Sequence, residues 1–169
     1  MADVARVEVV GLRVEMPSSQ PVLVLRELEG RRRVMTIYIG GPEATAIHTA
    51  LEGAKPPRPL THDLSLLLLE AAGTSLERVT ITEIRAETFF ADLSLRSPAG
   101  AETVSGRPSD AVALALRAGA DIYVASELLD EVGREISDES PAEEEESVVD
   151  EFRDFLDTIS PEDFSDPTS

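Results

Sequence analysis

Alternating hydrophobic and polar positions open the chain and predict strands. Residues 4–15 alternate and are rich in valine, a pattern typical of a strand. Residues 21–28 and 33–39 are predicted as the second and third strands, with a plausible turn at Glu29 and Gly30 between them. The first forty residues are therefore predicted to supply three strands of a sheet.

Two helices are predicted to follow these strands. Pro42 fits a first helical turn, where its missing N–H costs nothing, so a helix is predicted over 43–51. The proline-rich stretch 54–60 is predicted to be extended. A second helix is predicted over 62–72, with Thr61 as its N-cap.

The second half of the chain returns to strands and closes with helices. The elements predicted there are strands over 76–85, 88–96, 102–104 and 122–125, and helices over 108–118 and 126–132. This order is not a regular βαβ alternation. It indicates an α+β fold with a mixed, mostly antiparallel sheet, hairpin-connected strands and three to four packed helices.

The composition changes after Gly133. Residues 134–169 hold 14 acidic and 2 basic residues, net −12, whereas 1–133 hold 19 and 13, net −6. A folded domain is predicted over 1–133 and a flexible acidic extension over 134–169. Apolar residues at helical spacing over 148–159 predict a short amphipathic helix, which we expect to dock in cis or on a protein partner.

Composition also narrows the classes of function. The chain has no Cys, which excludes disulfides, thiolate catalysis and Cys-based zinc sites, and its aromatic content of 4% disfavours stacking platforms for single-stranded nucleic acid. No signal peptide and no membrane-spanning run are recognised, so we expect a cytoplasmic protein without a membrane partner. The net charge of −18 disfavours simple DNA binding, but not an enzyme whose site is neutralised by a metal ion.

Charged and hydroxyl side chains gather where loops pass into helices. The first turn of a helix offers free N–H groups and the positive end of the helix dipole, so anions are readily bound there. Three such junctions, at 39–47, 57–64 and 107–115, contain the candidate site residues: Glu43, Arg58, Thr61, His62, Asp63, Arg107, Ser109 and Asp110. If the junctions converge, they form one polar pocket.

The same junctions resemble a known family. The matching stretches include Ile39-Gly40 with Glu43-Ala44, Arg58-Pro59 with Thr61-His62-Asp63-Leu64, and Arg107-Pro108-Ser109-Asp110-Ala111. In the order and spacing of these motifs, residues 5–133 resemble the bifunctional nuclease domain, and the acidic extension looks like that of actinobacterial members. The resemblance implies a compact α+β fold, cleavage of both DNA and RNA, and assembly into homo-oligomers.

Three carboxylates and one histidine are the candidates for catalysis. Phosphodiester cleavage at neutral pH usually needs carboxylates that hold divalent cations, and Glu43, Asp63 and Asp110 each lie in a predicted first turn. Mg²⁺ or Mn²⁺ is the expected ion. His62 could act as the general base. The alternative is structural: the acids complement helix dipoles, and the histidine only hydrogen-bonds a neighbour.

Two arginines and two hydroxyls are the candidates for substrate binding. Arg58 and Arg107 each precede a proline that holds the backbone extended, and a fixed guanidinium can bind phosphate through two hydrogen bonds. Thr61 and Ser109 lie beside them at the helix starts. The alternative is that each is a buried arginine that satisfies loop carbonyls or pairs with Asp63 or Asp110.

Two functions stay open: a metal-dependent nuclease acting on DNA and RNA, and a non-enzymatic oligomeric binding or regulatory module with a structural polar pocket. Negative charge and low aromatic content favour the second, and the family resemblance favours the first. Strands with apolar residues on both faces, at 7–10 and 22–25, predict self-association. The basic cluster at 31–33 is interpreted as a solvated face that could contact nucleic acid or the acidic extension.

Overall fold

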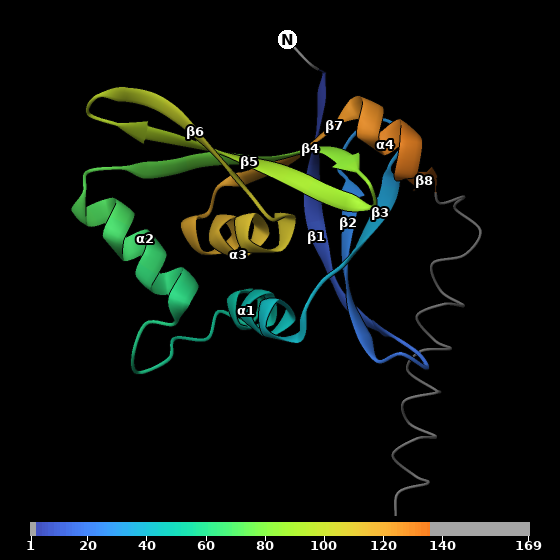
Figure 1. Cartoon of the computed structure of the whole chain (residues 1–169), viewed down its shortest axis with the longest axis horizontal. Helices are drawn as coiled ribbons and strands as arrows, with labels where there is room; N and C mark the ends of the chain where they lie inside the picture. The colour runs from blue at the N-terminus through green and yellow to red at the C-terminus, as the bar shows by residue number, and fades with distance from the viewer. Residues whose placement is uncertain (1–2, 136–169) are drawn as a thin grey trace, which may run out of the picture. The chain divides into compact units, whose positions relative to one another are not determined.

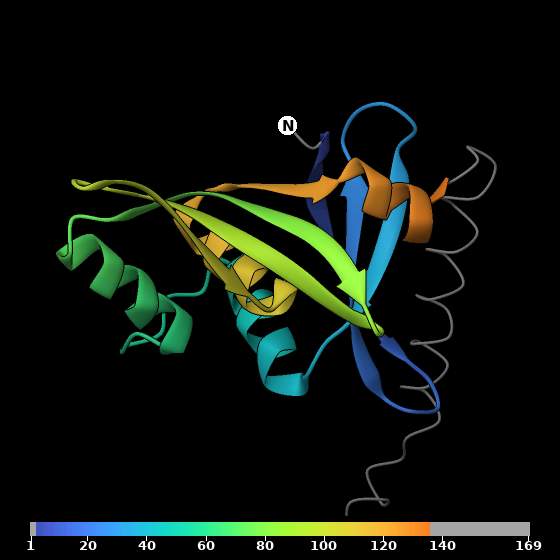
Figure 2. The ribbon, with the colours of Figure 1, turned by 45° about the horizontal axis from the view of Figure 1, so that its top comes forward.

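A twisted sheet with helices against it makes up the part of the chain that the computed structural model describes, residues 3–135 (Figures 1 and 2). The elements are β1 (Val4–Glu15), β2 (Gln20–Glu27), β3 (Arg33–Tyr38), α1 (Gly41–Leu51), α2 (Thr61–Ala71), β4 (Ser75–Arg85), β5 (Thr88–Ser97), β6 (Gly100–Gly106), α3 (Pro108–Ala118), β7 (Asp121–Ala125), α4 (Ser126–Val132) and β8 (Arg134–Glu135). Every element predicted between residues 3 and 135 is present, with its ends within two residues of the predicted ones.

The sheet has eight strands in the order β6-β5-β4-β7-β1-β2-β3-β8. Its neighbouring strands are antiparallel except for β4 and β7, which pair in parallel because the chain returns to the sheet through α3. Antiparallel neighbours need only short hairpins, whereas a parallel pair needs a crossover. The predicted mixed, mostly antiparallel α+β fold is confirmed.

Helix α3 lies at the centre of the helical layer and sets the distance between its neighbours. Its residues Ala111, Ala113 and Ala115 are completely buried. Small side chains on several sides let α3 contact the sheet through β4 and β5 while α1 and α2 pack against it. The starts of the three helices therefore come close together.

Helix α2 begins one residue earlier than predicted, and its cap differs. Leu60 is the N-cap residue, and its backbone N–H donates to Asp63 Oδ2 at 2.9 Å. A carboxylate that reaches back three residues satisfies an N–H that the helix itself cannot. Thr61 is therefore the first residue of the helix and not its cap, and Asp63 has a local structural role.

The sheet continues two residues beyond Gly133, since Arg134 and Glu135 pair with β3 as strand β8. The compact unit that contains the described residues ends at Glu135. The predicted helix over 148–159 and most of the acidic extension lie outside the described residues. Between residues 3 and 135, each helix is too short or too polar to cross a membrane.

Candidate functional site

Three helix starts meet at one pocket of about 320 Å³. Its wall is formed by α1 (Pro42, Glu43, Thr45 and Ala46), by the start of α2 (Leu60, Thr61 and His62), and by the start of α3 (Arg107 and Asp110). The three loop-to-helix junctions at 39–47, 57–64 and 107–115 therefore converge on one pocket, as the sequence predicts.

Arg107 joins two carboxylates at this pocket. Its Nη2 lies 2.9 Å from Glu43 Oε1, and its Nε donates to Asp110 Oδ2 at 2.7 Å. Pro108 follows Arg107 at the start of α3, and Arg107 itself is extended, with φ −73° and ψ 141°. The Arg107 side chain is 65% exposed, whereas that of Glu43 is only 17% exposed. The guanidinium thus covers the carboxylates from the solvent side.

His62 completes a connected chain of four side chains. Its Nε2 lies 3.1 Å from Asp110 Oδ1, so Asp110 contacts Arg107 with one oxygen and His62 with the other. Partial burial of Asp110 opposes its ionisation, but hydrogen bonds from Arg107 and His62 outweigh burial and hold its pKa below the usual value. Asp110 is therefore an ionised carboxylate that orients the imidazole.

Asp63 belongs to a separate pair. Arg117 Nε donates to Asp63 Oδ1 at 2.7 Å, and Arg117 Nη1 donates to the Ala113 carbonyl at 2.9 Å. Burial raises the pKa of Asp63, but the hydrogen bonds from Arg117 and the Leu60 N–H lower it further, so the net shift is downward. This pair ties α2 to α3 beside the pocket, and Asp63 is not among the residues that line it.

Sequence reasoning missed Arg117, which is 8% exposed. It lies seven residues after Asp110, two turns along α3, so both side chains project from one side of the helix. Helical spacing from Asp110 was the signal that could have identified it.

The predicted substrate-binding residues divide into two groups. Arg107 and Thr61 line the pocket, whereas Ser109 is buried and does not. Arg58 is exposed and makes no hydrogen bond or ion pair with any residue between 3 and 135. The structure brings together Glu43, Thr61, His62, Arg107 and Asp110 and leaves Arg58 and Ser109 outside this set.

The three carboxylates proposed as metal ligands do not converge on one point. Glu43 and Asp110 face the same guanidinium, while Asp63 faces Arg117. Among residues 3–135 no three His, Asp or Glu side chains lie close enough to share an ion. A metal at this site would have two carboxylate ligands from the protein and would need water or substrate oxygens for the others.

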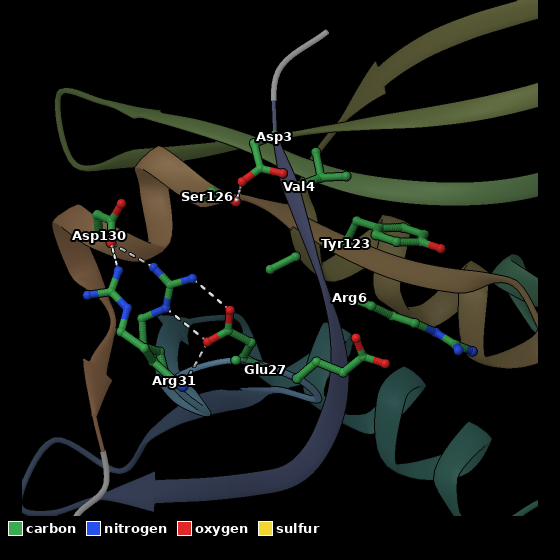
Figure 3. A pocket seen from close by; sticks show the side chains of 12 residues that line it. Asp3, Val4, Arg6, Glu27, Arg31, Tyr123, Ser126 and Asp130 are labelled. Carbon is green, nitrogen blue, oxygen red and sulfur yellow. Dashed lines mark hydrogen bonds and ion pairs between the residues drawn. The ribbon is translucent and has the colours of Figure 1, made fainter.

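A larger pocket of about 540 Å³ lies between β1, the β2–β3 turn and α4 (Figure 3). Four of the charged residues that line it pair with one another: Glu27, Arg31, Arg33 and Asp130. Arg33 is 8% exposed and donates to both Glu27 oxygens, at 2.9 and 2.7 Å, and Arg31 and Arg33 both contact Asp130. Most of the basic cluster at 31–33 thus holds α4 against the β2–β3 hairpin. The interpretation of that cluster as a solvated face is wrong for Arg33, because its side chain is buried in its contacts with Glu27 and Asp130.

Comparison with known proteins agrees with the motifs. A family model described as the bifunctional nuclease domain matches residues 23–137. Two proteins of Mycobacterium tuberculosis strains, "Uncharacterized protein MT1877" and "Uncharacterized protein Rv1829", are each 48% identical to this chain over 162 residues, covering 94% of this chain and 96% of the relative. The family match runs from β2 to beyond β8 and includes both the pocket and Arg117. The chain therefore belongs to the bifunctional nuclease domain family.

Proposed function

We propose that this protein hydrolyses phosphodiester bonds of DNA and RNA at the pocket where α1, α2 and α3 begin. The observation that supports this most directly is the contact chain Glu43–Arg107–Asp110–His62 along one pocket wall. It combines an imidazole, an ionised carboxylate and an exposed guanidinium in a member of a nuclease family.

His62 would act as the general base and Asp110 as its positioning residue. The carboxylate contacts Nε2, which leaves Nδ1 as the nitrogen that can take a proton from an attacking water. Arg107, being exposed, would bind a phosphate oxygen of the substrate as a charge-assisted hydrogen-bond donor. Thr61 lines the same wall and would donate its hydroxyl to the substrate.

A divalent cation, Mg²⁺ or Mn²⁺, belongs to this proposal as a cofactor. Mg²⁺ is commonly bound through one or two carboxylates together with water and substrate phosphates, and Glu43 and Asp110 would bind it in this mode after release from Arg107. Such an ion would supply positive charge to the phosphate and lower the pKa of a bound water. Asp63 could serve as a further ligand only after release from Arg117.

The histidines offer a matched test. His62→Gln removes the proposed base, whereas His48→Gln changes an exposed histidine on α1. With full-length protein, single-stranded DNA or RNA and Mg²⁺ or Mn²⁺, we expect His62→Gln to slow cleavage roughly 10²–10⁴-fold and His48→Gln to leave it unchanged. Equal rates in the two variants would refute the role of His62, and cleavage that persists in a chelator would refute the metal.

A second candidate function is a binding module without catalysis. It is favoured by one observation: each pocket carboxylate is already ion-paired. In that case an Arg107→Gln variant loses affinity for an oligonucleotide while no preparation cleaves it.

We also propose, for either function, that the protein assembles into homo-oligomers and is located in the cytoplasm. The lack of Cys suits a reducing compartment.

A further inference from the structure

The pocket where α1, α2 and α3 begin has apolar lining residues that the proposed reaction does not use. They are Pro42 and Ala46 of α1 and Leu60 at the start of α2, and they share the pocket with the exposed guanidinium of Arg107. No Phe or Tyr ring from residues 3–135 lines the pocket. Apolar side chains beside a cation suit a ligand that has an apolar part and an anionic part.

Leu60 is an unusual residue for its place in the chain. It is the N-cap of α2, a position where Ser, Thr, Asp and Asn are preferred and leucine is a poor choice. Its side chain also stays 44% exposed, so burial in the core stabilises it little. Neither capping nor burial accounts for a leucine at the pocket, whereas contact with a ligand would.

We propose that the pocket binds one unpaired base of a single-stranded nucleic acid, with Pro42, Ala46 and Leu60 against the base and Arg107 on an adjoining phosphate. This inference rests on the proposed function and deepens it, because it narrows the substrate to unpaired strands. The pocket volume of about 320 Å³ lies at the lower end of the range of about 300–1,000 Å³ found for small-molecule sites. It therefore suits a single nucleotide.

A base can present its face to this lining only when it lies outside a helical stack. In a duplex the base faces are stacked on one another, and only base edges are accessible in the grooves. Enzymes that bind an extruded base hold it between aromatic or apolar side chains, and extrusion costs free energy that an unpaired strand does not lose. One base held by aliphatic side chains also needs no platform of stacked aromatic rings.

The charge of the domain favours the same substrate. Residues 1–133 have a net charge of −6. A DNA duplex carries one negative charge per about 1.7 Å of its axis, whereas a single strand carries one per about 3.4 Å. The acidic domain therefore repels a single strand less than it repels a duplex.

Arg58 offers a second contact for the same strand. It is exposed and forms no ion pair with residues 3–135. It lies two residues before Leu60, so the Cα atoms of the two residues are at most about 7 Å apart. A strand with one base at Leu60 thus has a neighbouring phosphate within reach of Arg58.

The variant Leu60→Ser separates contact with the base from folding. Serine is a preferred N-cap, so this variant should keep or raise the Tm of the parent. Leu68→Ser is the matched control, since Leu68 is an exposed leucine of α2 that does not line the pocket. The probes are a short fluorescent single-stranded DNA and a strand of the same length made of abasic sites, which keeps the sugars and phosphates and lacks the bases.

Binding would be measured by fluorescence anisotropy with full-length protein at low salt, with Ca²⁺ in place of Mg²⁺ and the strands checked for integrity afterwards. We expect the parent and Leu68→Ser to bind the strand with bases roughly tenfold more tightly than the abasic strand, and Leu60→Ser to bind both strands equally. A parent that binds neither strand, or both equally, would overturn the proposal. A preference for bases that persists in Leu60→Ser would overturn it as well.

Cleavage gives a second readout. With Mg²⁺ or Mn²⁺, the parent should cleave the single strand at least roughly tenfold faster than the same strand in a duplex, because a paired base must first be extruded. Equal rates on the two substrates would overturn the proposal and leave the hydrolytic function standing. Preference for bases in the binding assay without cleavage by any preparation would support the base site and refute the hydrolytic function alone.

Discussion

At the scale of single residues, Glu43 reaches Arg107 because residue 40 has no side chain. A Cβ added at Gly40 would overlap Glu43 Oε2, whereas one added at Gly41 would have nothing within 4 Å. The overlap involves the far end of a flexible side chain, so Gly40→Ala should displace the Glu43 carboxylate without unfolding the domain.

We therefore predict that Gly40→Ala lowers cleavage as much as Glu43→Gln does, with a change in Tm of at most a few degrees. Gly41→Ala is the matched control and should retain the parental rate. Rates would be measured on an oligonucleotide and Tm by calorimetry. If Gly40→Ala cleaves as fast as the parent, the contact between Glu43 and Arg107 has no part in the reaction.

The Asp110 carboxylate should make stability depend on pH in acid. Its folded-state pKa lies below the unfolded value of about 3.9 because Arg107 and His62 donate to the ionised form. The stability it contributes is fully present above the unfolded pKa and is lost as pH falls through the folded pKa. In urea unfolding, the difference in free energy between the parent and Asp110→Asn should shrink below about pH 4. A difference that stays constant from neutral pH to pH 3 would contradict this account.

At the scale of elements, α2 is attached to α3 by an ion pair whose two members differ in burial. Arg117 is 8% exposed and Asp63 28%, and Arg117 Nη2 is buried without a partner among the described residues. Removing Asp63 would leave a buried guanidinium unpaired. Removing Arg117 would leave the Asp63 carboxylate, which is accessible to solvent and still accepts a hydrogen bond from the Leu60 N–H.

Asp63→Asn should therefore destabilise the protein more than Arg117→Met does. Loss of one partner of a buried pair costs about 3–5 kcal/mol when the remaining charge stays buried, and an apolar replacement of similar length costs less. Urea midpoints at neutral pH measure both variants. The reverse ranking would show that packing of the Arg117 stem, and not its charge, stabilises the α2–α3 contact.

The elements themselves could be predicted from the sequence because their signals are local. Alternating hydrophobic and polar residues predict β1, and a proline in the first helical turn marks the start of α3. β6 was predicted only over 102–104 but extends over Gly100–Gly106, because pairing with β5 adds residues that have no strand pattern of their own. Strand order, including the parallel β4–β7 pair, depends on contacts between distant segments and could not be predicted.

The difference between local signals and distant contacts also explains which parts of the candidate site could be predicted. The junction motifs identified Glu43, His62, Arg107 and Asp110 because each motif is short and marks a helix start. They could not show that Asp63 turns away from the pocket, since its partner Arg117 lies 54 residues further along the chain. Partner choice between charged side chains is a tertiary property, so sequence motifs locate candidate groups better than they assign their contacts.

At the scale of the whole molecule, positive charge available to a polyanion is scarce. Most arginines of the described domain are in ion pairs: Arg6, Arg26, Arg31, Arg33, Arg85, Arg96, Arg107 and Arg117. Basic surface normally supplies most of the affinity of nucleic-acid binding. A nuclease built on this domain should therefore bind its substrate weakly and depend on local charge at the site.

Residues 136–169 add to the repulsion, whatever their conformation. They hold 13 acidic residues and 1 basic residue, net −12 out of the total −18. A chain that ends at Glu135 keeps β8 and should bind a short oligonucleotide more tightly than the full chain at low ionic strength. The difference should fade near 0.15 M salt, where the Debye length is about 8 Å. Replacing Glu143, Glu144, Glu145 and Glu146 by Gln in the full chain separates charge from length and should give an intermediate affinity in a fluorescence-anisotropy titration. If truncation strengthens binding equally at all salt concentrations while the Gln variant behaves as the parent, the extension acts by covering the site and not by its charge.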